Sequence, residues 1–220
     1  MKIIDITPLV CEDLAVWPGD TPYQRQVLMD TDQGDHLGLS KITTTLHLGA
    51  HADAPNHYAP QSRGIDGRSL HPYLGPVQVV KAHVPQGERI TKDHLNDFQI
   101  QAPRILFRTD SFLDPNSWRE DFCSLSPQLI QELAEQNVLT VGLDTPSIDP
   151  FSSRELESHK VIHKHNMAIL EGLVLKDVEP GLYTLIALPL RLKNADASPV
   201  RAVLLPYQIF NGVAFSSPLS

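Results

Sequence analysis

The sequence has only two cysteines, and it lacks any apolar run long enough to cross a membrane. Cys11 and Cys123 lie far apart and form no C-x-x-C pair, which argues against a disulfide framework and against a thiolate zinc site. We expect both to be buried thiols without a chemical role. No stretch approaches the ~20 apolar residues of a membrane span, and Asp5 interrupts the N-terminus too early for a signal peptide. A cytoplasmic protein is therefore expected.

The chain also has few basic residues. Lysine and arginine total 18 against 26 aspartates and glutamates, which gives a formal net charge of −8. This balance argues against nucleic acid or an anionic membrane surface as a partner. At 220 residues, with no linker of low complexity and no internal repeat, the chain is expected to form one domain over 1–220.

Residues that can bind metals are concentrated in one stretch, which reads HLGAHADAPNH. Three histidines and one aspartate, all good ligands, occupy odd-numbered positions there. In an extended chain alternate side chains point the same way, so the four would start on one face. They are His47, His51, Asp53 and His57.

This stretch cannot be a straight strand if its ligands share one ion. A rise of ~3.3 Å per residue would put His47 and Asp53 roughly 20 Å apart. Gly49 permits a bulge or a close approach, and Pro55 should end ladder pairing. The i,i+4 spacing of His47 and His51 also fits a zinc-binding helix, but the threonines before the stretch, Gly49 and Pro55 disfavour one.

The flanking segments predict how this stretch is presented. Lys41–Leu48 alternates as a strand that would deliver His47, and the irregular segment Tyr58–Tyr73 is expected to form a pocket rim. The turn-rich loop Val16–Pro22 carries Trp17, which could be a core anchor or the wall of an aryl pocket.

The remaining chain reads as alternating strands and helices with polar connections. Strands are expected at Lys2–Thr7, Gln24–Met29, Val77–Val84, Arg104–Thr109, Val138–Leu143, Tyr183–Leu190 and Val200–Leu205, helices at Thr91–Phe98, Ser126–Gln136 and Ser153–His165, and polar loops at Asp30–Gly38 and Asn194–Pro199.

Asp144 follows an expected strand, where either a turn residue or a site residue would fit. A second stretch with candidate metal ligands comes after it. The expected helix carries His159 and His163 one turn apart, with His165 at its end, and one helix face can present only some of them. Glu171 lies alone within the apolar run MAILEGLVL. A buried carboxylate is costly without a partner, so Glu171 either pairs with a base, binds a metal or faces solvent at a sheet edge.

These residues carry a family resemblance. HLGAHADAPNH resembles the H-x-G-T-H-x-D-x-P-x-H signature of the cyclase-like metal-dependent amidohydrolases, with Ala50 in place of the threonine. Further segments resemble the bacterial kynurenine formamidases (arylformamidases) within that family. The resemblance covers about Ile3 to Leu204, and the tail 207–220 has no assigned role. The further segments are Val16–Pro22, Gly142–Pro150, Met167–Gly172, Leu185–Leu190 and Asp196–Val203.

The resemblance implies an α/β fold of the swivelling β/β/α type with a mixed sheet, a homodimer, and two divalent metal ions per subunit. Zinc is the expected ion, with manganese as the alternative. By position, His47, His51 and Asp53 would bind one ion. Asp53 would bridge to a second ion held by His159 and Glu171, while His57 would act as acid and base and Trp17 would line an aryl pocket.

The activity implied by the resemblance is metal-dependent hydrolysis of a small molecule, N-formyl-L-kynurenine, to L-kynurenine and formate in tryptophan catabolism. A bound metal suits this reaction because it generates a strong nucleophile from water at neutral pH. Two alternatives remain at this point: a cyclic-amide hydrolase such as isatin hydrolase, and a non-catalytic metal-binding domain.

Overall fold

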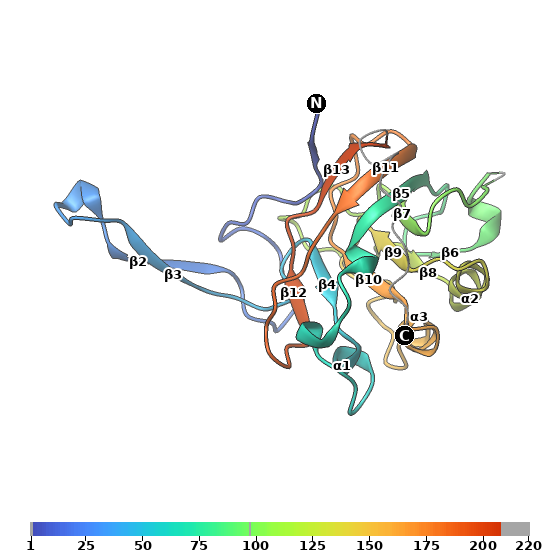
Figure 1. The fold of residues 1–220 in the computed structure, drawn as a ribbon, viewed down its shortest axis with the longest axis horizontal. Coiled ribbons are helices and arrows are strands. Elements are labelled where there is room, and N and C mark those ends of the chain that lie inside the picture. The colour runs from blue at the N-terminus through green and yellow to red at the C-terminus, as the bar shows by residue number, and fades with distance from the viewer. Residues whose placement is uncertain (1, 97, 208–220) are drawn as a thin grey trace.

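The computed structural model describes residues 2–96 and 98–207, and its main element is a curled mixed sheet of nine strands (Figure 1). Apart from Tyr207, the tail 207–220 lies outside the described residues. In sheet order the strands are β1 (Ile4–Asp5), β13 (Val203–Pro206), β11 (Gly181–Ile186), β5 (Leu74–Lys81), β7 (Arg104–Arg108), β9 (Thr140–Leu143), β10 (Ala168–Glu171), β4 (His51–Asp53) and β12 (Ala197–Pro199).

The centre of the sheet is parallel and its two margins are antiparallel. Strands β5, β7, β9 and β10 run parallel to one another, and every other pairing in the sheet is antiparallel. Alternation along β7 shows why both faces are apolar: Ile105 and Phe107 pack on one face and Leu106 on the other. The expected α/β fold with a mixed sheet is confirmed.

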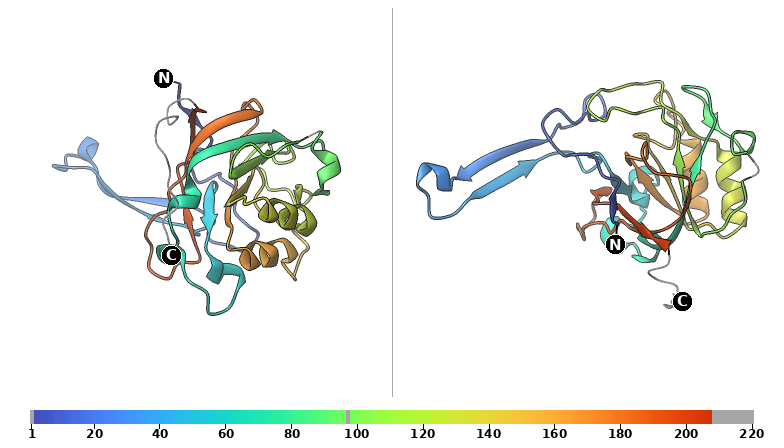
Figure 2. Two further views of the ribbon diagram at one scale, coloured as in Figure 1. Left: turned by 45° about the vertical axis from the view of Figure 1, so that its right-hand side comes forward. Right: turned by 90° about the horizontal axis from the view of Figure 1, so that it is seen from above.

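Helices cover one face of the sheet (Figure 2). On the other face the sheet curls, so that its own strands enclose the second core cluster. Helix α2 (Pro127–Glu135) begins as predicted, because the Ser126 side chain accepts a hydrogen bond from the Leu129 backbone. The predicted apolar stripe of Leu129, Ile130 and Leu133 is buried. Helix α3 (Glu157–Lys164) packs beside it.

The prediction that α3 begins near Ser153 was wrong by about one turn. The Ser153 hydroxyl accepts a hydrogen bond from the Leu156 backbone, as a cap would, but Leu156 adopts a left-handed conformation (φ 49°). That residue interrupts the helix, so the capping bond closes a separate turn. The helix predicted at Thr91–Phe98 is likewise one 3-10 turn, η4 (Lys92–His94), although Thr91 caps it.

Strands β2 (Gln24–Met29) and β3 (Leu39–Thr43) form a separate ribbon that projects from the body (Figure 1). The prediction of β2 is confirmed, whereas the strand predicted at Lys41–Leu48 is confirmed only over Lys41–Thr43, because β3 ends at Thr43. Its alternation does not reflect a buried face, since every residue of β3 is exposed. His47 is therefore delivered by a loop.

The predicted polar loop Asn194–Pro199 contains strand β12, which pairs with the ligand-bearing strand β4. The sequence did not predict this strand, because three residues are too few to show a periodic pattern and the strand is defined by its pairing with β4. The other short elements are β6 (Arg89–Ile90), which pairs with β8 (Ser124–Leu125), the helix α1 (Pro55–Tyr58), and the 3-10 turns η1 (Thr31–Gln33), η2 (Ile65–Gly67) and η3 (His71–Tyr73). Among the described helices, none is both long and apolar enough to span a membrane.

Candidate metal centre

Two paired strands place three of the candidate ligands. His51 and Asp53 lie on β4, two residues apart, so their side chains project from the same face. Glu171 is the last residue of β10, and the antiparallel register sets it directly opposite His51. The sheet thus brings together groups that are separated by more than a hundred residues.

Two glycines allow the chain to bend around these ligands. Gly49 has a φ of 52°, and Gly172 has a φ of 64°. A Cβ atom on Gly172 would overlap the carbonyl oxygen of Gly49, so the two segments approach more closely than any side chain permits. The bend between His47 and His51 that the sequence requires is made at this contact.

The carboxylate of Asp53 lies at the centre of the candidate site. Its Oδ1 is 3.1 Å from Nδ1 of His47 and 3.5 Å from Nε2 of His51, while its Oδ2 is 3.5 Å from Nε2 of His159. The two oxygens therefore face different histidines. Glu171 spans the same two directions, with Oε2 at 3.2 Å from Nε2 of His51 and Oε1 at 3.8 Å from Nε2 of His159.

These groups fit a metal better than they fit one another. Nε2 of His51 and both carboxylate oxygens of Asp53 are buried, yet none has a hydrogen-bond partner in the described part of the chain. Buried polar atoms are nearly always hydrogen-bonded, and leaving one unpaired costs ~1–3 kcal/mol. Three such atoms that lie within about 3.5 Å of neighbouring ligand atoms are what a bound cation would satisfy.

The electrostatics of the cluster are dominated by its carboxylates. Burial opposes a charge on His51, but Asp53 and Glu171 outweigh this effect and raise the pKa of His51 to about 10. Burial also opposes a charge on His159, and Asp149 and Asp53 raise its pKa to about 10. The pKa of Asp53 is held well below its usual range by the surrounding histidines, despite burial. The cluster therefore attracts positive charge strongly.

Residues behind the ligands orient them. Nδ1 of His159 lies 2.8 Å from Oδ2 of Asp149, and Arg89 contacts the other oxygen of that carboxylate at 3.0 Å. Nδ1 of His51 lies 2.8 Å from the carbonyl oxygen of Gly49. A partner on the remote nitrogen leaves the other imidazole nitrogen free for a metal. Sequence reasoning missed Asp149 and Arg89 as site residues because neither shares a local motif with His159.

The other predicted residues divide between the site and the surface. His57, on α1, has one ring nitrogen within 4.8 Å of ligand atoms of Asp53 and His159. His163 is exposed on α3, and the His165 ring binds Gln131, so neither joins the cluster. Asp144 accepts hydrogen bonds from the backbones of Thr109 and Asp110, and it also lines the cavity beside the cluster, so it has a structural role at the edge of the site.

The cluster of candidate ligands opens into a cavity of about 430 Å³ with an aromatic wall. Trp17 lines it, remains 36% exposed, and packs edge to face on Trp118 with ring centroids 5.2 Å apart. Trp17 is thus a wall of the cavity rather than a core anchor. The pocket rim predicted at Tyr58–Tyr73 was wrong, since none of those residues lines the described cavity. Ile65 and Tyr73 of this connection are buried in the core instead. Exposed lining residues, among them Asp20, Leu113 and Lys176, form the rim.

The chain resembles known proteins in sequence and in structure. It is 46% identical to the kynurenine formamidase of Bordetella pertussis, over 92% of this chain and 97% of that protein. A solved structure described as a potential metal-dependent hydrolase with cyclase activity is 27% identical, covers 92% of this chain and 96% of its own, and has a TM-score of 0.80.

A more distant solved structure shares the fold. Isatin hydrolase A from Labrenzia aggregata is 22% identical, with a TM-score of 0.78 and coverage of 94% of both chains. The Cyclase family model matches residues 4–150, a range that includes the histidine signature and ends before His159 and Glu171. With this match and the formamidase relative, the chain belongs to the Cyclase family.

Proposed function

We propose that this chain hydrolyses N-formyl-L-kynurenine to L-kynurenine and formate, and so acts in tryptophan catabolism as an arylformamidase. The observation that carries the proposal is the joint presence of a complete cluster of histidines and carboxylates and an aromatic cavity in a chain 46% identical to a kynurenine formamidase. Without either part, the cluster or the cavity, a hydrolase of aryl amides would lack its nucleophile or its substrate site.

The ligand set that we propose contains two divalent ions. His47, His51 and Asp53 would hold one ion, and Asp53 with His159 and Glu171 would hold the other. The division is supported by Asp53, whose two oxygens face different histidines. Imidazole and carboxylate donors suit zinc, and manganese accepts the same ligands. Such ions supply a nucleophile from water at neutral pH and stabilise negative charge on a carbonyl oxygen.

The side chains around the cluster would then position the substrate and move protons. His57 lines the cavity beside the cluster, where its imidazole can hand a proton to the aryl amine nitrogen as the amide bond breaks. The face of Trp17, together with Trp118, offers a flat apolar surface for the substrate ring. Near the cavity mouth, Lys176 is the only lysine or arginine among the described lining residues, and it suits the carboxylate of an amino-acid substrate.

The function is tested by removing the metal and by varying the substrate. Treatment with a chelator should abolish hydrolysis of N-formyl-L-kynurenine, and added zinc should restore it. The reason is that the proposed reaction depends on the bound metal to generate its nucleophile from water. We expect the zinc-loaded enzyme to prefer N-formyl-L-kynurenine over formanilide, which lacks the amino-acid end, and over isatin, a cyclic amide. Rates are measured by absorbance of the released amine or the opened ring.

The same panel separates the alternatives. Full activity in metal-free protein would rule out the metal-dependent reaction. A preference for isatin would identify a cyclic-amide hydrolase, and two bound ions without turnover on any of the three compounds would identify a non-catalytic metal-binding domain. The complete set of candidate ligands argues against the last of these.

A homodimer is the second part of the proposal, and the projecting ribbon supports it. An isolated two-stranded ribbon is marginal in water, yet this one exposes large apolar side chains. A second copy of the chain would cover them. The exposed apolar residues of the ribbon and its connection are Val27, Leu28, Leu37, Leu39 and Ile42.

Charges on the ribbon should therefore change the oligomeric state. The double variant Leu28→Asp/Ile42→Asp should shift the mass in analytical ultracentrifugation from twice the chain mass of 24.4 kDa to a single chain mass. The matched control Gln26→Asp, on an exposed polar position of β2, should stay dimeric. A monomeric wild type would disprove the dimer, and a dimeric double variant would place the interface elsewhere. The cytoplasmic location stays a prediction.

A further inference from the structure

Asp196 is a carboxylate that the proposed ligand set does not use. It lies beside the cluster, next to the edge strand of the sheet. It precedes strand β12, whose pairing with β4 sets Ala197 opposite Asp53. The backbone carbonyl of Asp196 accepts a hydrogen bond from the Ala54 backbone at 2.8 Å. Strand pairing therefore fixes the position of Asp196 relative to the ligand strand.

The loop that carries Asp196 is held from several sides. The carbonyl oxygen of Ala195 accepts from the Ile65 backbone, and the Asn194 backbone donates to Oδ1 of Asp66 at 2.9 Å. Asn56 donates to the carbonyl oxygen of Asn194. Although the Asp196 side chain is 48% exposed, its backbone is thus as constrained as a strand, and the carboxylate is presented from a rigid support.

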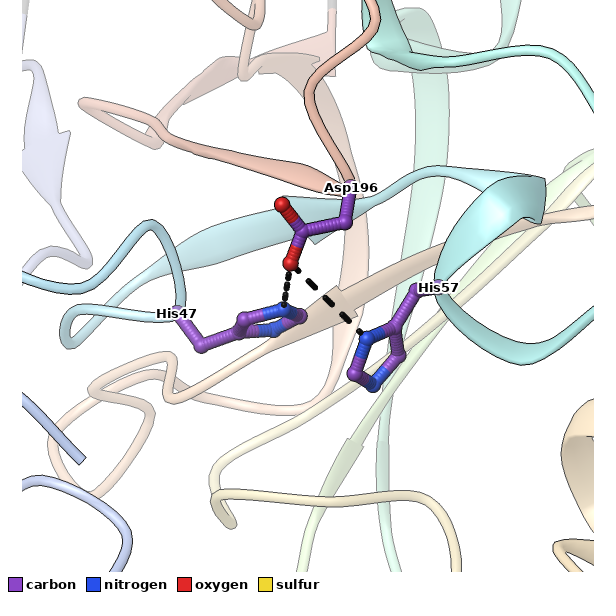
Figure 3. Close-up of side chains that lie close together, drawn as sticks. All are labelled: His47, His57 and Asp196. Atoms are coloured by element: carbon purple, nitrogen blue, oxygen red, sulfur yellow. Dashed lines mark hydrogen bonds and ion pairs between the residues drawn. The ribbon is translucent and has the colours of Figure 1, made fainter. Parts of the chain in front are cut away.

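One oxygen of this carboxylate contacts both histidines at the ends of the signature (Figure 3). Oδ2 of Asp196 lies 3.0 Å from Nε2 of His47 and 4.0 Å from Nδ1 of His57. The first distance is a hydrogen bond, while the second is too long for one but within ion-pair range. The two rings are close neighbours, with centroids 4.2 Å apart.

The hydrogen bond decides which nitrogen of His47 can act as a ligand. In the neutral tautomer in which Nε2 of His47 carries the proton and donates it to Asp196, Nδ1 keeps a lone pair and faces Oδ1 of Asp53 at 3.1 Å. Two acceptors at that distance repel unless a cation lies between them. An acceptor beside Nε2 favours this tautomer, which leaves Nδ1 available to a metal.

We propose that Asp196 is a positioning residue that holds His47 as a metal ligand and orients His57 through the same oxygen. The inference rests on the proposed two-ion centre. It assigns Asp196 no contact with the substrate and no contact with the ions. Carboxylates that orient histidine ligands typically contribute 10–100-fold to metal affinity or activity.

The test measures zinc affinity separately from turnover. Asp196→Ala should weaken one of the two zinc ions by about 10–100-fold in competition with a chromophoric chelator and leave the other unchanged. At saturating zinc, kcat for N-formyl-L-kynurenine should fall by about 10-fold or more with little change in KM, since His57 loses its orientation. Asp196→Asn, whose amide oxygen can still accept the His47 proton, should lie between the alanine variant and the wild type.

Asp66→Asn is the matched control, because Asp66 anchors the same loop without contacting a histidine. It should leave both zinc affinities and kcat unchanged. Wild-type affinities and kcat in Asp196→Ala would overturn the proposal, as would an equal loss in Asp66→Asn, which would mean that the loop and not the carboxylate matters. If the wild type itself binds no zinc or hydrolyses no formamide, the proposed function fails instead.

Discussion

Asp53→Asn is expected to lose both metal ions and to reduce kcat/KM for N-formyl-L-kynurenine by about 10³-fold or more. Metal activation of a carbonyl is worth several kcal/mol, and each ~1.4 kcal/mol corresponds to a factor of ten. The effect is large because both oxygens of Asp53 are engaged, one toward His47 and His51 and the other toward His159. An amide offers one oxygen and turns two N–H donors toward a site that needs acceptors.

Metal content after dialysis and steady-state kinetics measure this result, with thermal unfolding followed by circular dichroism to confirm that the variant folds. Glu171→Gln provides a graded comparison. In the proposed ligand set Glu171 serves the second ion alone, so this variant should retain one ion per chain. Asp66→Asn, outside the cluster, should retain two. If folded Asp53→Asn kept two ions and near-normal turnover, Asp53 would not be the bridging ligand.

His57→Ala is expected to keep both ions and to lose about 10²–10⁴-fold in kcat, the usual contribution of a general acid or base. The side chain of His57 is 36% exposed, whereas those of His51 and His159 are 3% exposed, so His57 reaches the cluster from the solvent side. Nδ1 of His57 faces Asp196. This contact restricts the orientation of the imidazole, which suits a group that transfers protons.

The His57→Ala variant distinguishes a role in proton transfer from a role as a metal ligand. A ring nitrogen of His57 lies close enough to Asp53 and His159 to complete a three-ligand group with them. If His57→Ala loses an ion but turns over normally per remaining ion, His57 is a ligand and its proposed role in proton transfer is wrong. His163→Ala, one helical turn from His159 on the exposed face of α3, is the control and should match the wild type.

Local sequence patterns predict correctly those features whose physical causes lie within a few residues. The N-cap of α2 was predictable because Ser126 and Pro127 act on the next three residues alone. The alternation that put His51 and Asp53 on one face held because it is a property of any extended chain. The same rule misled at Lys41–Leu48, since an exposed ribbon also alternates without burying either face.

Neighbouring residues in the sequence could not show whether a given side chain has a structural or a chemical role. Glu171 needed a partner by virtue of its apolar surroundings, but nothing in the surrounding letters identified that partner. The strand register brings Glu171 to the cluster, by setting it opposite His51. Likewise, helix α3 carries two histidines one turn apart, and the packing of α3 on the body decides that His159 is buried while His163 is exposed.

The residues read alone show which donor types the centre contains, that the HLGAHADAPNH stretch must bend if its ligands share an ion, and that a buried Glu171 needs a partner. These conclusions follow from side-chain chemistry and from backbone freedom, which act over a few residues. Folding brings these donors together around Asp53 and supplies the residues that support them, among them Asp149 behind His159 and Asp196 beside His47. Strand pairing and helix packing create those contacts between distant segments, and such contacts leave no periodic pattern in the chain.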